Sequence, residues 1–239
     1  MSVVIEICTD SLGSAITAEQ HGAHRIELCA GLADGGVTPS QGTIQSVVKK
    51  LNIPVNVLIR PRPGNFHYTK DEVDSMLKDI AFCKKSGVTG IVTGALLANG
   101  DVDIETSGRL LEAIHPMDST FHRAFDVVPT PLQALQIIII LGYQRILTSG
   151  QMMSAFEGRF NLAEYVKAAQ DKIIIMPGAG INEDNITELY KCTKATEYHM
   201  SLRKPASKEH CLESLSTNST LLYLSGQRLD EVVKIIQKL

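Results

Sequence analysis

Residues 3–29 read VVIEICTDSLGSAITAEQHGAHRIELC. Two short apolar runs, Val3–Cys8 and Arg25–Cys29, flank a stretch that has the pattern of a helix with turns. A strand, a helix and a second strand in this order predict a βαβ unit, in which the two strands lie parallel.

The same alternation continues along the chain. Apolar runs rich in β-branched residues recur after stretches with a helical pattern, which predicts eight strands in all. Eight βαβ-linked strands predict a closed (β/α)8 TIM barrel, and the length of 239 residues is close to the ~250 typical of this fold. We therefore expect residues 1–239 to form a single barrel domain. The six further runs are Val55–Arg60, Gly90–Thr93, Thr120–Arg123, Arg145–Thr148, Ile173–Met176 and Glu197–Ser201.

Local signals support the helices between these runs. Thr69 and Glu72 have the spacing of a capping box at a helix start. Thr130 followed by Pro131 predicts a second helix start, so we assign the four isoleucines 137–140 to a helix and not to a strand. Residues 204–220 are polar and unpatterned, and we expect an irregular connection there.

Composition excludes several classes of protein. The net charge is -3 and aromatic residues make up only 5%, which argues against binding to nucleic acid. No window is apolar enough to span a membrane, and the N-terminus has no signal-peptide pattern. The five cysteines include no CxxC pair, which predicts reduced thiols and a cytoplasmic location. We interpret Cys83, Cys192 and Cys211 as inert.

The first two strands carry the same pair of polar groups. Successive strand residues face opposite sides of a sheet, so Glu6 and Cys8 share one face, as do Glu27 and Cys29. If the alternating isoleucine and leucine residues face the helices, all four side chains point into the barrel. Free cysteines are most often small buried hydrophobes, but two thiols in register on adjacent strands also suit Cu(I).

The other strand ends are polar too, and each group has two interpretations. Glu6 and Glu27 are either structural partners of Arg60 or Arg123, or an acid/base pair. Arg60 and Arg62, on a loop stiffened by prolines, are either solvated charges or an anion clamp. The remaining candidates are His122 and Asp126 for proton transfer, and Arg123 and His199 for substrate binding.

Several of these blocks, taken in order, resemble the CutC family of copper homeostasis proteins. The resembling blocks are Glu6–Cys8, Gly22–Cys29, Gly35–Ser40, Ile59–Arg62, Thr120–Asp126 and Arg145–Gly150, with Thr9 and Val37 as small departures. The resemblance implies a (β/α)8 barrel, a cytoplasmic location, and Cu(I) bound by the two cysteines that match, Cys8 and Cys29.

Two functions remain open at this point. The first is a copper homeostasis protein that buffers or passes on Cu(I). The second is an enzyme for a small phosphate- or carboxylate-bearing substrate, in which Arg60 and Arg62 hold the anion, Glu27 or His122 is the base, and Glu6 or Asp126 is its partner. A barrel used only as an interaction scaffold would have lost its polar rim. Because oligomers of this fold are common, we also expect a homo-oligomer, a dimer in the simplest case.

Overall fold

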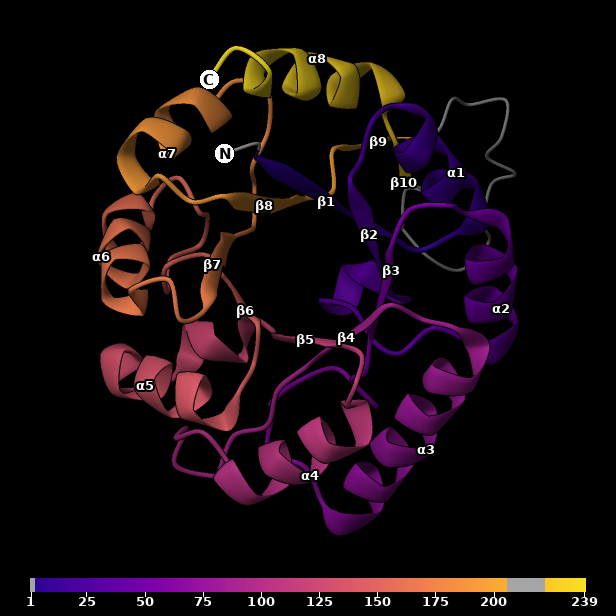
Figure 1. Ribbon diagram of the computed structural model, residues 1–239, viewed down its shortest axis with the longest axis vertical. Coiled ribbons are helices and arrows are strands. Elements are labelled where there is room, and N and C mark those ends of the chain that lie inside the picture. The colour runs from indigo at the N-terminus through magenta and orange to yellow at the C-terminus, as the bar shows by residue number, and fades with distance from the viewer. Residues whose placement is uncertain (1–2, 206–221) are drawn as a thin grey trace.

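The computed structural model describes residues 3–205 and 222–239. Eight strands form one parallel sheet in the order β7-β6-β5-β4-β3-β2-β1-β8, and β7 also lies against β8, so that the sheet curls into a nearly closed barrel (Figure 1). The predicted (β/α)8 fold is confirmed. The strands are β1 (Val4–Thr9), β2 (Arg25–Leu28), β3 (Val55–Leu58), β4 (Gly90–Thr93), β5 (Asp118–Phe121), β6 (Arg145–Thr148), β7 (Ile174–Pro177) and β8 (Glu197–Met200).

A ring of helices surrounds the strands, as Figure 1 shows in the view along the barrel. Each βα unit contributes one helix, which packs its apolar face on the outside of the sheet. The helices are α1 (Leu12–Gln20), α2 (Gln41–Lys50), α3 (Lys70–Ser86), α4 (Ile104–Ile114), α5 (Pro131–Leu141), α6 (Arg159–Ala169), α7 (Ile186–Thr193) and α8 (Gly226–Ile236), with short 3-10 turns at Leu32–Asp34 and Arg123–Val127.

The buried apolar residues fall into two clusters. The larger cluster includes Ile5, Ile7 and Ile26 and joins the strands to the helices, as the alternation predicts. A small separate cluster contains Cys8 and Cys29 together with Leu58 and Val92. The thiols therefore belong to the barrel interior, apart from the main core.

The predicted helix signals are present. Thr69 accepts from the backbone N–H of Glu72, and the Glu72 carboxylate accepts from the backbone N–H of Thr69, which completes the capping box of α3. The isoleucines 137–140 lie in α5, as expected. Within the described residues, no helix combines the length and the apolar character that crossing a membrane requires.

Several expected strand ends are displaced by one or two residues; the third strand, for example, ends at Leu58 and not at Arg60. The fifth strand ends at Phe121 and not at Arg123, because the ring of His122 accepts from the backbone N–H of Ala124 and the chain turns into a 3-10 helix. Residues 204 and 205, expected to begin an irregular connection, instead belong to a short strand, β9 (Arg203–Pro205), which is antiparallel to β10 (Leu222–Leu224). Cys211 and the rest of residues 206–221 lie outside the described part of the chain.

Candidate functional site

A pocket opens at the carboxyl ends of the strands, which is the functional end of a (β/α)8 barrel. It holds about 200 Å³. Residues from the ends of β1, β2, β3, β5, β6, β7 and β8 or from the loops that follow them form its wall. The polar lining residues are Cys8, Glu27, Cys29, Arg60, His122, Arg123, His199, Ser201 and Arg203.

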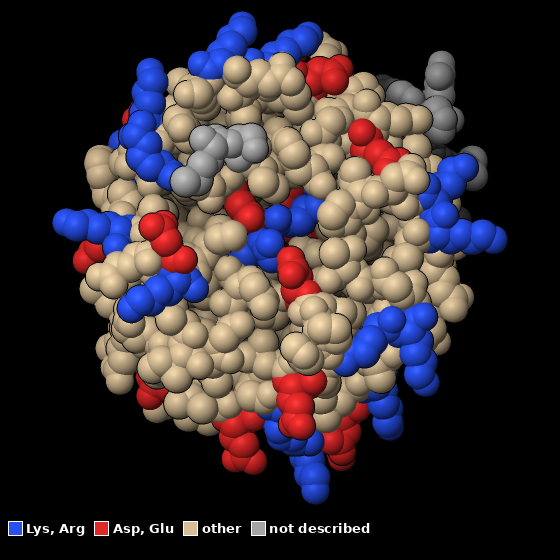
Figure 2. Space-filling view, in the orientation of Figure 1, with Lys and Arg blue, Asp and Glu red and all other residues tan. Residues whose placement is uncertain are grey.

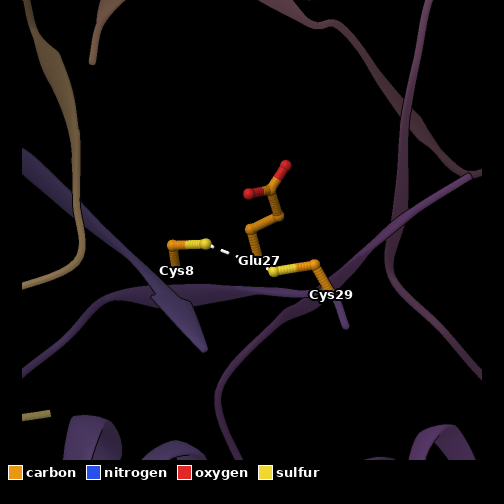
Figure 3. Close-up of side chains that lie close together, drawn as sticks. All are labelled: Cys8, Glu27 and Cys29. Carbon is orange, nitrogen blue, oxygen red and sulfur yellow. Dashed lines mark hydrogen bonds between the residues drawn. The ribbon is translucent and has the colours of Figure 1, made fainter. Parts of the chain in front are cut away.

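Cys8 and Cys29 contact each other in this pocket. Their Sγ atoms lie 3.4 Å apart, and both residues are buried. Figure 3 shows the two thiols pointing toward each other, with the side chain of Glu27 rising beside them. One ligand atom from each of the three residues lies within 4.8 Å of the others, and among the described residues this is the one group of that kind. The arrangement can hold a metal ion.

The register explains how the two thiols meet. Cys8 lies opposite Glu27 in the pairing of β1 with β2, and the backbone N–H of Cys29 donates to the carbonyl of Thr9. The strands are thus staggered, as closure of a barrel requires: the register partner of Cys8 is Glu27, and Cys29 lies two residues further along the chain. The sequence pattern had placed the two carboxylates in one layer; instead Glu6 lies opposite Arg25, one layer below Glu27.

Two of these three groups, the Cys8 thiol and the Glu27 carboxylate, are held toward their neutral forms. The contact with Cys29, together with burial, raises the pKa of the Cys8 thiol well above its usual value. Burial also raises the pKa of Glu27, which the neighbouring imidazole of His199 only partly offsets. A metal ion that binds here must displace protons.

Below the pocket lies a network of buried ion pairs. Glu6 is fully buried and accepts from Nε of Arg25 at 2.5 Å and from the amide of Asn56 at 3.1 Å. Arg25 also pairs with Glu197, whose carboxylate accepts from Nε of Arg145 at 2.8 Å. The partner of Glu6 is therefore Arg25, and not Arg60 or Arg123 as the sequence had suggested. Figure 2 shows basic and acidic side chains next to one another at the centre of the barrel face in view.

His199 joins this network to the pocket. Its Nδ1 lies 2.8 Å from an oxygen of Glu6, and its Nε2 lies 3.6 Å from an oxygen of Glu27. Burial alone would lower the pKa of His199, but the charge of Glu27 and the contacts with Cys8 and Glu6 raise it well above its ordinary value. Burial likewise opposes ionisation of Glu6, yet Arg25 and His199 lower the pKa of that carboxyl to about 2. Glu6 thus acts on the pocket through His199 and does not line it.

The two arginines of the β3 loop separate. Arg60 lines the pocket and is buried, whereas Arg62 points away from it. Nε of Arg62 pairs with Glu72 at the start of α3, and its guanidinium lies over the ring of Tyr68. The structure therefore does not bring the two halves of the expected anion clamp together, because a local carboxylate holds the second arginine.

The surroundings of His122 and Asp126 do not suit the proton-transfer role that the sequence predicted for them. Nδ1 of His122 accepts from the backbone N–H of Ala124 at 3.3 Å, and burial with the nearby charge of Arg60 lowers the pKa of His122 to about 3. A ring with that pKa is a poor base at neutral pH. The Asp126 carboxylate accepts from Arg123, Thr148 and the backbone of Ser149, so that it holds the loop after β6 and lies outside the pocket wall. Arg123 remains at the rim.

Sequence reasoning missed several charged residues. Arg25 lies two positions before Glu27, and Glu197 lies two positions before His199, so the same alternation that placed the later residue inside the barrel also places the earlier one there. That signal was available. Arg203 lines the pocket from the segment after β8, and no local pattern marks it.

Comparison with known proteins adds a family to this geometry. The model of the CutC family matches residues 3–204. A CutC family protein of Parabacteroides distasonis is 49% identical over 85% of this chain and 84% of its own length. The human copper homeostasis protein cutC homolog is 44% identical over 84% of this chain and 73% of its own. The crystal structure of a CutC protein from Streptococcus agalactiae superposes with a TM-score of 0.80 at 32% identity, covering 83% of this chain and 98% of that one.

Proposed function

The chain belongs to the CutC family, and from that premise we propose that it binds Cu(I) through Cys8 and Cys29 and serves in copper homeostasis. The observation that carries this proposal is the contact of 3.4 Å between the two Sγ atoms inside the pocket. Thiolates are soft ligands, and a site with two of them favours Cu(I) over metals that prefer four harder ligands.

The rest of the pocket suits this choice. Metal–thiolate bonds of about 2.3 Å allow the two sulfurs to lie up to about 4.6 Å apart around one ion, so the thiols separate from their present contact when an ion enters. Among the described residues, Glu27 is the one carboxylate grouped with them, and a hard carboxylate oxygen with a raised pKa is a weak ligand for a soft ion. All of the proposed ligands come from one chain, and the expected dimer is not needed to complete the site.

We place this function in the cytoplasm, where thiols stay reduced. Two thiolates buried in a pocket that opens to solvent suit reversible binding, and hence buffering or transfer of copper, because the ion can enter and leave without unfolding of the chain. The same two residues match the cysteines that the family resemblance implies.

The test is a titration of the reduced protein with Cu(I) under anaerobic conditions, in competition with a chelator. We expect about one ion per chain, with the affinity lost in both Cys8→Ser and Cys29→Ser. Cys83→Ser is the matched control, because Cys83 is also a buried free thiol but lies on α3. Binding that survives both of the first two substitutions, or that Cys83→Ser abolishes equally, contradicts the proposal; circular dichroism verifies that each variant folds.

A second function is favoured by the cations around the pocket. Arg60, Arg123 and Arg203 all line it, and a copper site made of two thiols needs none of them. We propose as the alternative an enzyme for a small anionic substrate, with Glu27 as the proton-transfer group, His199 and Glu6 holding it, and arginines binding the anion. A screen of small phosphates and carboxylates tests this function: turnover that Glu27→Gln abolishes supports it, and turnover that persists in that variant contradicts the assigned role.

A further inference from the structure

Two arginines, Arg25 and Arg60, are deeply buried in this barrel, and they differ in whether a carboxylate neutralises the charge. Arg25 pairs with the carboxylates of Glu6 and Glu197. Arg60 is 5% exposed, and in residues 3–205 and 222–239 no carboxylate forms an ion pair with it. A buried charge is costly unless it is paired. Arg60 therefore has a charge for which the described residues provide no counter-ion.

The hydrogen bonds of Arg60 lead to the same point. Its terminal nitrogens donate to the backbone carbonyls of Gly36, at 2.8 Å, and Gly64, at 2.7 Å. These bonds fix the guanidinium in place but carry no negative charge. The Nε atom is buried and has no acceptor in the part of the chain that the structure describes. An orphaned N–H beside a cavity indicates a missing acceptor.

His122 supplies a second orphaned donor on the same side of the pocket. Because its Nδ1 accepts from the backbone N–H of Ala124, the neutral ring carries its hydrogen on Nε2. That Nε2 atom is buried and also has no partner among the described residues. His122 is 4% exposed and lines the pocket. It is thus a neutral hydrogen-bond donor, as in enzymes where an uncharged imidazole polarises a carbonyl.

Phe66 joins the two donors into one wall. The guanidinium of Arg60 lies 4.9 Å from the centre of the Phe66 ring, and the ring of His122 lies 4.8 Å from the same centre. All three side chains line the pocket. Its volume of about 200 Å³ is below the ~300–1,000 Å³ of pockets for drug-sized ligands, so a ligand here is small.

We propose that Arg60 and His122 form an oxyanion-binding wall, which takes the phosphate or carboxylate group of a small molecule. Arg60 supplies the positive charge and a free Nε–H, and His122 supplies the Nε2–H. The inference rests on the second of the proposed functions and assigns its anion-binding residues. It replaces the pair of Arg60 and Arg62 by Arg60 and His122, and it gives His122 the part of a donor and not that of a base.

The experiment is an NMR titration of the reduced, copper-free protein, labelled with ¹⁵N, first with inorganic phosphate and then with acetate at constant ionic strength. We expect saturable shifts of signals from the pocket with at least one of the two ions, and an affinity about tenfold or more weaker in Arg60→Met and in His122→Asn. Binding of phosphate alone, of acetate alone or of both identifies which oxyanion the wall accepts, and each of these results supports the proposal.

The variants are chosen to separate binding from folding. His122→Asn keeps an acceptor for the backbone N–H of Ala124 but removes the Nε2–H, so it stays informative if Arg60→Met disturbs the loops that Arg60 holds. Arg62→Met is the matched control, because it removes the same charge from the same loop and leaves the pocket wall intact. No saturable shift with either ion, or equal binding in the parent and His122→Asn, overturns the proposal.

The titration detects binding without turnover and is repeated on Cys8→Ser. Loss of copper binding with the anion affinity unchanged separates the wall from the thiol site. A wall that binds anions in a protein without enzymatic turnover defeats the second proposed function and leaves this inference standing. A pocket that turns over a substrate but binds no phosphate or acetate does the reverse.

Discussion

Nδ1 of His199 lies 2.8 Å from a carboxylate oxygen of Glu6, within the barrel. The histidine is from the last strand of the barrel and the glutamate from the first, so that the pair spans the junction of β8 with β1. Since Glu6 has no exposed surface, its charge depends on its partners. His199 lines the pocket and Glu6 lies in the buried network below it, so a change in the ionisation of this pair affects both the stability of the barrel and the charge in the pocket.

The first prediction concerns the ionisation of His199. Because Glu27 and Glu6 raise its pKa, we expect the ring in the copper-free protein to stay protonated at pH 7. A group whose folded pKa is raised stabilises the fold fully below its ordinary value of 6.5, and this stabilisation is lost as the pH rises through the folded value. The measurement is a pH titration of the histidine ring signals by NMR, with His199→Gln to assign the signal. A midpoint at or below 6.5 would show that burial outweighs the two carboxylates.

The second prediction concerns Glu6. Glu6→Gln removes one of the two carboxylates that pair with the buried guanidinium of Arg25. Breaking such a buried pair lowers the free energy of unfolding by about 3–5 kcal/mol. In the parent protein, the contribution of Glu6 is present above its ordinary pKa of 4.5 and is lost as the pH falls toward 2. Urea unfolding at pH 7 and at acid pH measures both effects.

Asp74→Asn is the control for this substitution. Asp74 pairs with Arg109 at 3.5 Å on the surface, where both side chains are more than 40% exposed, and such pairs contribute about 0–1 kcal/mol. We therefore expect Glu6→Gln to cost several times more than Asp74→Asn. Equal costs would mean that the buried network does not stabilise the barrel more than a surface pair does.

The third prediction separates two metals at the thiol pair. Glu27→Gln removes the carboxylate that the described part of the chain places beside Cys8 and Cys29. Because Cu(I) depends on the thiolates, its affinity changes by less than about threefold. Zn(II) accepts carboxylate oxygen and needs more ligands, so its affinity falls by about tenfold or more. Competition titrations of both ions with the parent and the variant decide the matter. An equal loss for both would make Glu27 a ligand of Cu(I) as well.

Much of this architecture could be predicted from local pattern. The apolar runs and the helix signals between them gave the eight units, and the two-residue alternation placed Glu6, Cys8, Glu27 and Cys29 on the inner face. The alternation has no information on how far one strand slides past the next, since that stagger is a property of the closed barrel. The sequence therefore predicted that Cys8 and Cys29 approach each other, whereas the stagger through which they do so and the pairing of Glu6 with Arg25 required the structure.

The β3 loop shows a second limit. Arg60 and Arg62 are the same residue type and each precedes a proline, but one is buried at the pocket and the other binds Glu72. What separates them is the position of a carboxylate on α3, which depends on how the helix packs. Likewise, the role of His122 depends on one hydrogen bond from Ala124, which sets the ring tautomer and which no sequence pattern reports.

The last prediction concerns the glycine behind His122. A Cβ added at Gly94 would lie 2.8 Å from Nδ1 of His122 and 3.1 Å from Cζ of Phe121, and both rings are packed in the barrel. Gly94→Ala therefore pushes the imidazole away from the backbone N–H of Ala124, and overpacking of this kind costs about 1–3 kcal/mol.

Gly108→Ala in α4 is the matched control, since a Cβ there meets nothing within 4 Å and alanine favours the helix by about 1 kcal/mol. Thermal unfolding should thus show opposite shifts of Tm for the two variants. A stable Gly94→Ala protein with an unmoved His122 signal would mean that the ring has room to shift, and that the wall of the pocket is less rigid than its contacts indicate.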